Sequence, residues 1–454
     1  MINRIVRRKD LKNKPKIHIP TENIQILENA RIFYDAVLSY IKKSRKRIYM
    51  SALYLQDDEA GRNVLTALFK AKEKNNDLDI KIFVDFHRAQ RGLIGEKNNK
   101  GNIVFYNEFK KNFTSEIEIY GVPVKKKELF GVLHLKGFTF DDTYIYSGAS
   151  LNNVYLNHFD KYRLDRYFII RNKKLADATV AYLEEYLLSN SAVSLFEDGN
   201  GIATKDIKKD IVKLKKSLSK AEYNYDGDCK DSTEPKDNEV ALTLLSGFGK
   251  KNNELNDTII ALLKNSSNNI TIYTPYLNFP KKILKEIKAL IKRKVSLNLI
   301  VADKEANDFY TPPGKGFQKI DALPYIYEQN LRNFAKKFDK SIKDGLLNIF
   351  IWRDKDNTFH LKGLESDNKY YLLTGSNLNP RAWNLDLENG MLIYDEKEIL
   401  LESFKKESDS IKKNSYKITD FSEVPEIKDY PKEVKKIVSR LKNTKFDYFI
   451  KKLI

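Results

Sequence analysis

The sequence contains one short pattern twice, as "VLHLKGFTFDD" at residues 132–142 and "TFHLKGLESDN" at residues 358–368. Each copy has a His, a Lys two residues later and an Asp five residues after the Lys, and the copies lie about half the chain apart. The chain has only 5 His, and two of them stand in this pattern. The doubling predicts an internal duplication, or a site that needs two matched halves.

The similarity between the two halves extends beyond these copies. Two strand-like runs precede each copy in the same order, and an amphipathic helical pattern precedes the first run: 30–43, 47–55 and 79–89 in the first half, and 256–267, 269–277 and 297–306 in the second. Alternating helix and strand patterns are typical of α/β units on a mostly parallel sheet. We predict an α/β protein of two homologous halves, related by a pseudo-twofold axis, with one active site at their interface.

The chain divides into five segments by composition and pattern. They are a basic N-terminal arm (1–28), the first α/β half (29–203), a charged helical or linker segment (204–238), the second α/β half (239–425) and a basic C-terminal helix (426–454). The apolar residues of the last segment have helical spacing with lysines between them. This pattern fits a helix docked on the body, or a basic amphipathic helix on anionic lipid.

The chain is strongly basic, with 81 Lys+Arg against 62 Asp+Glu and a net charge of +19. This charge favours anionic partners such as nucleic acid, anionic lipid or phosphorylated substrates. The single Cys229 excludes an intramolecular disulfide and a cysteine-rich metal cluster, and we interpret it as an incidental thiol. We find no apolar core of a secretory signal and no run of about 18–20 apolar residues that would span a bilayer. We expect a cytosolic or peripheral protein.

The repeated segment carries the groups that phosphate chemistry needs. In a strand, residues i and i+2 share a face, so His134 and Lys136 project together, as do His360 and Lys362. A lysine offsets the charge of phosphate oxygens while a histidine attacks or transfers a proton. If the halves meet, one histidine can be the nucleophile and the other the general acid. Each motif ends in an aspartate of a predicted hairpin turn, where turn chemistry is the alternative role: Asp141 and Asp367.

The residues behind each copy also match when Gly148 is aligned with Gly375. Three of them are candidate donors to phosphate oxygens, with helix capping and turns as the alternative: Asn152, Asn379 and Ser376. Two carboxylates at related positions are candidates to orient a histidine: Asp165 and Glu388.

The doubled His-x-Lys-x4-Asp, followed by Gly-Ser/Ala-x-x-Asn, resembles the HKD motif of the phospholipase D superfamily. Stretches such as "ALYLQDDEAGRNVLTALFKAK", "DKYRLDRY" and "TGSNLNPRAWNLDLEN" further resemble the bacterial CDP-diacylglycerol–serine O-phosphatidyltransferases of Gram-negative type, from about residue 30 to residue 454. The resemblance implies two α/β halves with one active site and a covalent phosphohistidine intermediate, without a metal ion or cofactor. It implies six catalytic residues: His134, Lys136, Asp141, His360, Lys362 and Asp367.

The resemblance also implies a reaction and its setting. The phosphatidyl group passes from CDP-diacylglycerol to L-serine with release of CMP, at an anionic membrane surface on the cytosolic face of the inner membrane and with no obligatory nucleic acid. We favour His134 as the nucleophile.

In "DFHRAQRG" (85–92), three basic residues follow a predicted strand and suit the pyrophosphate of a CDP group, with surface charge as the alternative: His87, Arg88 and Arg91. The equivalent place in the second half offers Lys304, Asn307 and Asp308.

One departure and two alternatives remain at this stage. Ala149 stands where the superfamily has a serine, so the first half offers one donor fewer. Another HKD enzyme, such as a cardiolipin synthase, a phospholipase or a nuclease, shares the motif. A non-catalytic nucleic-acid-binding protein with the same fold would share the basic charge. The sequence makes no prediction of the oligomeric state.

Overall fold

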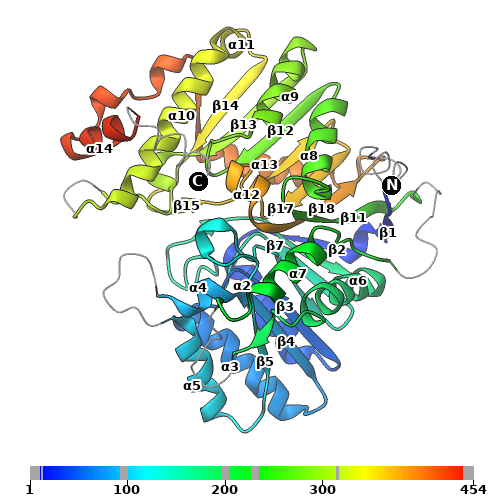
Figure 1. Cartoon of the computed structure of the whole chain (residues 1–454). Coiled ribbons are helices and arrows are strands. Elements are labelled where there is room, and N and C mark those ends of the chain that lie inside the picture. The colour runs from blue at the N-terminus through cyan, green and yellow to red at the C-terminus, as the bar shows by residue number, and fades with distance from the viewer. Residues whose placement is uncertain are drawn as a thin grey trace.

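The computed structural model describes residues 11, 14–92, 101–196, 204–225, 235–312 and 316–442. They form two α/β halves that meet along a broad interface, with the first half below and the second above in Figure 1. Within these residues no helix has both the length and the apolar character that crossing a membrane requires.

The first half is built on an eight-stranded mixed sheet. In spatial order its strands are β10 (Ser194–Leu195), β5 (Glu118–Val122), β4 (Asp79–Asp85), β3 (Arg47–Ser51), β6 (Gly137–Phe140), β7 (Thr143–Ser147), β9 (Tyr167–Arg171) and β2 (Ile24–Leu27). The second half has a nine-stranded mixed sheet. Its strands are β1 (Ile17–Pro20), β11 (Glu239–Phe248), β18 (Leu387–Tyr394), β17 (Tyr370–Thr374), β16 (Gly363–Ser366), β12 (Asn269–Thr274), β13 (Ser296–Ala302), β14 (Leu347–Trp352) and β19 (Ser415–Ile418).

The two sheets repeat one topology, which confirms the predicted duplication. The run β5-β4-β3-β6-β7-β9 of the first sheet corresponds to β14-β13-β12-β16-β17-β18 of the second. The matched strand-like runs of the sequence fall on β3 and β12, and on β4 and β13. The expectation of a mostly parallel sheet was wrong. Among the described strands of these two sheets, only β3, β4 and β5 and their counterparts pair in parallel, because the motif segment returns as an antiparallel hairpin, β6–β7 or β16–β17.

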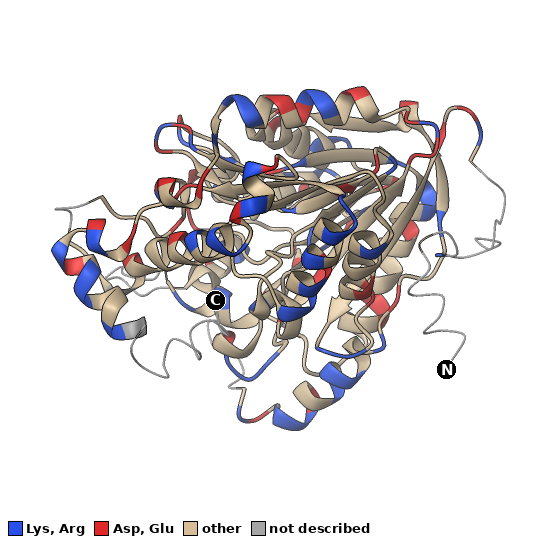
Figure 2. Ribbon diagram, turned by 90° about the horizontal axis from the view of Figure 1, so that it is seen from above, with Lys and Arg blue, Asp and Glu red and all other residues tan. Residues whose placement is uncertain are grey.

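Helices pack on both faces of the sheets: most cover the outer faces, and three contribute to the apolar cluster between the halves. The first half carries α2 (Ala30–Lys43), α3 (Glu59–Lys74), α4 (Phe86–Gln90), α5 (Asn102–Asn112), α6 (Lys173–Leu183) and α7 (Lys208–Leu218). The second carries α8 (Glu254–Asn265), α9 (Lys281–Lys292), α10 (Leu323–Lys337), α11 (Asp339–Lys343), α12 (Pro380–Asn384), α13 (Leu401–Lys413) and α14 (Lys432–Lys442). The predicted helices are confirmed as α2 and α8, and side chains of Asn29 and Asn253 cap their first turns. Lys, Arg, Asp and Glu lie mainly on these outer helices and loops in Figure 2, while the central strands carry few of them.

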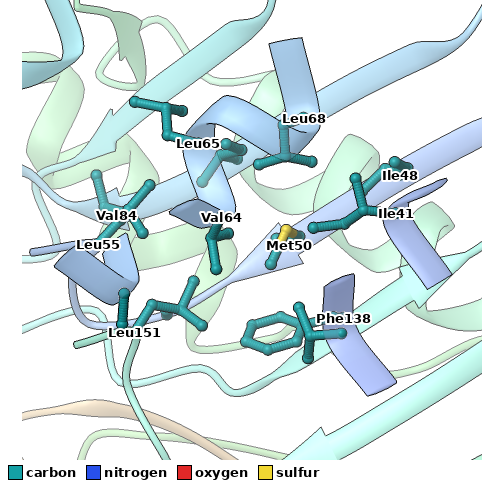
Figure 3. Close-up of a cluster of buried hydrophobic side chains, with 14 of the residues drawn as sticks. Ile41, Ile48, Met50, Leu55, Val64, Leu65, Leu68, Val84, Phe138 and Leu151 are labelled. Atoms are coloured by element: carbon teal, nitrogen blue, oxygen red, sulfur yellow. The ribbon is translucent and has the colours of Figure 1, made fainter. Parts of the chain in front are cut away.

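Three large apolar clusters hold the layers together. One lies between the first sheet and its outer helices, and Figure 3 shows part of it, with Val64 and Leu68 of α3 facing Met50 of β3. A second occupies the equivalent place in the second half. The third contains residues of both halves, such as Phe168 and Met391, and therefore fixes the halves against each other.

The chain ends depart in part from the predicted segments. Residues assigned to an N-terminal arm form β1 in the second sheet and β2 in the first, so this segment passes from one half to the other. At the other end, Val434 and Val438 of α14 pack in an apolar cluster with Ala322 and Tyr325. This contact is that of a helix docked on the body. Cys229 and residues 443–454 of the predicted C-terminal helix lie outside the described residues.

Candidate active site

Each motif segment is attached to the opposite half of the molecule. The backbone N–H of His134 donates to the carbonyl of Leu387 at 2.9 Å, and Leu387 N–H donates to Val132 at 3.0 Å. In the other motif, His360 N–H donates to the carbonyl of Leu164 at 2.9 Å, beside the short parallel pair β8 (Arg163–Leu164) and β15 (Thr358–Phe359). Both histidines therefore lie in extended segments just before β6 and β16, and not inside a strand as predicted.

These backbone hydrogen bonds between the halves place a carboxylate of one half against the histidine of the other. Leu387 is followed directly by Glu388, whose Oε2 lies 2.8 Å from His134 Nδ1. A Cβ on Gly375 would be in ordinary contact with both of these atoms, at 3.5 Å, and in tight contact with Lys136 Cγ, at 3.1 Å, so glycine leaves room for the Lys136 side chain beside this pair. The carboxylate thus fixes the imidazole through Nδ1 and directs Nε2 away from it.

His360 has a looser arrangement. Asp165 Oδ2 lies 3.6 Å from its Nδ1, and Lys362 Nζ hydrogen-bonds the same ring. The Tyr155 hydroxyl lies 3.0 Å from Nδ1 and 3.3 Å from Nε2. Gly148 repeats the role of Gly375, since a Cβ there would meet Asp165 at 2.6 Å. His360 is therefore surrounded by several polar groups where His134 has one close carboxylate.

The two motifs share one electrostatic environment. Burial lowers the pKa of His134 and of His360 well below the usual range, and the nearby lysines of both motifs add to this effect. Burial, with the charge of Lys362, lowers the pKa of Lys136 to about 7. Burial raises the pKa of Glu388 to about 8, against the opposite effect of the lysines. The pairs from the two halves thus form a single buried cluster that favours neutral imidazoles.

The structure does not bring the motif aspartates into this cluster. Asp141 accepts hydrogen bonds from the backbone N–H groups of Arg45, Lys46 and Arg47, at 2.8–3.0 Å. Asp367 binds the equivalent amides of residues 267–269 before β12, at 2.8–3.0 Å. Both have a left-handed backbone, with φ of 49° and 53°. These contacts fit the turn alternative and anchor the hairpin that carries each His and Lys.

The candidate donors behind the motifs divide into two groups. Asn379 is the N-cap of α12 and accepts from Ala382 N–H, and Asn152 accepts from Tyr155 N–H in a comparable turn. These contacts match helix capping and turns, which were the alternative role for both asparagines. Ser376 is fully buried, and its hydroxyl has no hydrogen-bond partner among the described residues. Its backbone N–H donates to Thr374 Oγ1 at 3.1 Å, so the hydroxyl is the group of Ser376 that remains a candidate donor.

The predicted basic group after β4 is held largely by protein contacts. The Arg88 guanidinium is buried, stacks 4.4 Å from the Tyr54 ring and donates to Gln56 at 3.0 Å. Arg91 makes a bidentate pair with Glu128 at 2.5 and 2.6 Å, and His87 Nε2 lies 2.8 Å from the carbonyl of Lys125. Asp85, which caps α4, also accepts from Leu133 N–H next to the first motif. This connection places α4 beside the site.

Sequence reasoning named Asp308 but missed the group that it forms around His360 with Arg163 and two tyrosines. Arg163 pairs with Asp308 at 2.9 Å, and Tyr276 donates to Asp308 at 3.0 Å. Tyr155 and Tyr276 both lie with their rings edge-on to the His360 ring. None of these contacts follows from the internal repeat, because Arg163 and Tyr155 stand in a stretch without an equivalent in the second half. Within the described part of the chain, no three His, Cys, Asp or Glu side chains are grouped as metal ligands would be.

Comparison with known proteins supports the family resemblance that the two motifs indicated. The family model described as "Cardiolipin synthase, PLD-like domain" matches residues 37–187 and 259–410, one segment in each half. The chain is 40% identical to the CDP-diacylglycerol–serine O-phosphatidyltransferase of Haemophilus influenzae, over 100% of both chains. It is 38% identical to the enzyme of that name from Escherichia coli, over 97% of this chain and 96% of the other.

A solved structure agrees over the full length. The crystal structure of phosphatidylserine synthase from Haemophilus influenzae covers 100% of both chains with a TM-score of 0.93 and 40% sequence identity. The doubled fold, the joint site and these similarities confirm the resemblance seen in the motifs. The chain belongs to the phospholipase D-like family and, within it, to the CDP-diacylglycerol–serine O-phosphatidyltransferases.

Proposed function

We propose that the protein is a phosphatidylserine synthase that transfers the phosphatidyl group of CDP-diacylglycerol to the hydroxyl of L-serine and releases CMP. The observation that carries this proposal is the joint cluster of His134, Lys136, His360 and Lys362 at the interface of two halves, in a chain similar over its whole length to enzymes of that name. Two buried lysines next to two imidazoles suit a phosphodiester anion.

His134 acts as the nucleophile in this proposal. Its Nδ1–H donates to the Glu388 carboxylate, which leaves the lone pair of Nε2 for the phosphorus. Attack forms the N–P bond and breaks the bond between phosphorus and the oxygen of CMP. The leaving group is a phosphate monoester with a second pKa of about 6, so CMP departs without needing a proton from the enzyme. Glu388 stabilises the positive charge of the substituted imidazole.

His360 acts as the general base of the second step. Burial keeps the imidazole neutral, so one ring nitrogen is able to accept the proton of the serine hydroxyl. The serine oxygen attacks phosphorus, the N–P bond breaks, and His134 is regenerated. Lys136 and Lys362 offset the charge of the phosphate oxygens in both steps, and a bound anion opposes the lowering of their pKa values. Asp141 and Asp367 position the hairpins. Arg88 is the preferred residue of the three predicted to bind the pyrophosphate, because its guanidinium contacts Gln56 and Tyr54 and, among the described residues, no carboxylate.

The proposal includes a peripheral location at an anionic membrane surface, on the cytosolic face of the inner membrane. The net charge of +19 supports attraction to a membrane that contains anionic lipid. CDP-diacylglycerol, as a lipid, lies in such a membrane. A second HKD activity, such as cardiolipin synthesis, is favoured only by the description of the family model, which covers the fold that these enzymes share.

The test is CMP release from CDP-diacylglycerol in mixed micelles containing EDTA, with and without L-serine. We expect serine to stimulate CMP release, with formation of phosphatidylserine, and both His134→Ala and His360→Ala to lose the serine-dependent product. Wild-type protein that releases no CMP from this liponucleotide would overturn the proposal.

A further inference from the structure

A buried ion pair from the two halves lies next to His360. Arg163 of β8 and Asp308, just after the short helix η4 (Lys304–Ala306), are 2.9 Å apart. Their side chains are only 15% and 16% exposed. A pair that is largely removed from water loses hydration that its mutual attraction repays only in part, so fold stability is a weak reason for its presence.

Two tyrosines connect this pair to the histidine. Tyr276 donates to Asp308 Oδ2 at 3.0 Å, and its ring lies edge-on to the His360 ring at 6.1 Å. The Arg163 guanidinium lies 4.4 Å from the centre of the Tyr155 ring, whose hydroxyl is 3.0 Å from His360 Nδ1. Arg163 Nε also donates to Thr358 Oγ1, two residues before His360. The pair and the histidine therefore border the same small region.

A neighbouring arginine shows what a structural pair in this fold looks like. Arg166 is buried and is held by two carboxylates, Glu365 and Glu407. Its guanidinium also stacks on Tyr273 and Phe404. Among the described residues, Arg163 is paired with one carboxylate, and it lies against the aromatic lining of the site.

We propose that Arg163 and Asp308 form the acceptor site, where they receive the carboxylate and the ammonium group of a free amino acid next to His360. The inference rests on the proposed function and adds to it the residues that select serine. A guanidinium matches a carboxylate with two parallel hydrogen bonds, and a carboxylate suits an ammonium group. A zwitterion laid alongside the pair gives four alternating charges, and no buried charge is left unpaired.

This arrangement explains how serine competes with water and other alcohols. The hydroxyl of serine is one carbon from the carbon that carries both charged groups, so anchoring those groups brings the hydroxyl to the His360 ring. A site built for polar groups rejects analogues that lack one of them, because its own buried charge then loses a partner. Ethanolamine lacks the carboxylate, and 3-hydroxypropionate lacks the ammonium group.

The experiment separates the acceptor step from the first step. Labelled CMP exchange into CDP-diacylglycerol, without serine, reports formation of the phosphatidyl-enzyme, and phosphatidylserine formation against serine concentration gives KM for serine. For Arg163→Met and Asp308→Asn we expect KM for L-serine to rise by about 10–100-fold, the scale of one lost charge-assisted pair. CMP exchange should stay within about 3-fold, and Arg163→Lys should recover part of the loss.

The acceptor analogues assign each charge. Arg163→Met should leave the slow reaction with ethanolamine unchanged, and Asp308→Asn should leave that with 3-hydroxypropionate unchanged. Arg62→Met, which removes an exposed arginine paired with Asp57 and Glu108, is the matched control and should alter neither step.

An unchanged KM for serine in folded variants would overturn the inference, as would an equal loss of CMP exchange. Wild-type protein without CMP exchange would instead refute the proposed function. Asp308→Asn, which preserves shape, keeps the test decisive if Arg163→Met does not fold.

Discussion

The surroundings of His134 and His360 arise from the same duplicated unit but differ in their contacts. His134 has one close carboxylate, Glu388 at 2.8 Å. His360 has a more distant carboxylate, Asp165 at 3.6 Å, together with Lys362, Tyr155 and the nearby Arg163–Asp308 pair. A single fixed carboxylate suits a nucleophile, whereas a ring beside several polar groups suits a base that serves a second substrate. The duplication therefore provides two equivalent histidines, and the contacts unique to each half give them different roles.

The most severe test of this difference is to remove each histidine separately. His134→Ala should lower CMP exchange by at least about 10⁴-fold, because no group remains to form the covalent bond. His360→Ala should lower phosphatidylserine formation by about 10²–10⁴-fold, the usual scale of general base catalysis, with a smaller effect on exchange. Steady-state exchange and product assays on both variants provide the measurement. Equal loss of exchange in the two would remove the assigned division of roles.

The carboxylates should differ as their histidines do. Glu388→Gln should slow CMP exchange by about 100-fold, because the amide cannot stabilise the charge on His134, while Asp165→Asn should cost about 10-fold. In the wild type, burial raises the pKa of Glu388 to about 8, and the ionised carboxylate is the stronger acceptor of the Nδ1–H and the form that stabilises a positive charge on His134. Exchange should thus rise with pH through about 8. A pH–rate profile in which Glu388→Gln keeps this rise would contradict the role of the carboxylate.

The motif aspartates should affect stability more than chemistry. Asp141→Ala and Asp367→Ala each leave three backbone N–H groups without their acceptor and put alanine at a positive φ. We expect each to lower the free energy of unfolding by about 2 kcal/mol, measured by urea denaturation, with little change in the rate per folded molecule. The matched variants Asp141→Asn and Asp367→Asn keep one acceptor and tolerate the left-handed backbone, so they should lose less. Rates that fall without any loss of stability would place these aspartates in the chemistry.

The smallest effect is expected at the position where the halves differ by one hydroxyl. Ser376 has a buried hydroxyl with no hydrogen-bond partner in the described ranges, whereas Ala149 occupies the equivalent place. Ser376→Ala should therefore not destabilise the fold and should slow exchange by about 3–10-fold if the hydroxyl donates to a phosphate oxygen. Ala149→Ser is the reciprocal variant. Thermal melting and exchange rates distinguish a donor from a buried group of no consequence, for which the rate would not change.

The sequence predicted those features that the duplication repeats. The two halves, the strands β3 and β12, the histidines and the lysines all follow from matched segments, and Glu388 and Asp165 were found as carboxylates at related positions behind the two motifs. The crossing of each carboxylate to the opposite histidine was not predicted, because it depends on backbone pairs such as Leu133 with Leu387 that span the two halves. Arg163 and Asp308 were not predicted as a pair for the same reason.

Two errors came from reading local patterns without their partners. The strand-like alternation around His134 and His360 suggested continuous strands, but these segments pair with the opposite half and the sheet strand begins only after the lysine. The sheets are mixed because the hairpin turn that both halves share, at Asp141 or Asp367, reverses the chain immediately. The assignment of the basic residues after β4 to a pyrophosphate stays a prediction, in which Arg91 would have to leave its bidentate partner Glu128.

The central claim is that two half-motifs build one site with His134 as the nucleophile, and a trapped intermediate tests it most directly. His360→Ala, mixed with CDP-diacylglycerol labelled in its phosphatidyl group and quenched without serine, should carry the label on His134 when its peptides are mapped by mass spectrometry. Label on another residue, or none on His134 while CMP is released, would contradict the claim.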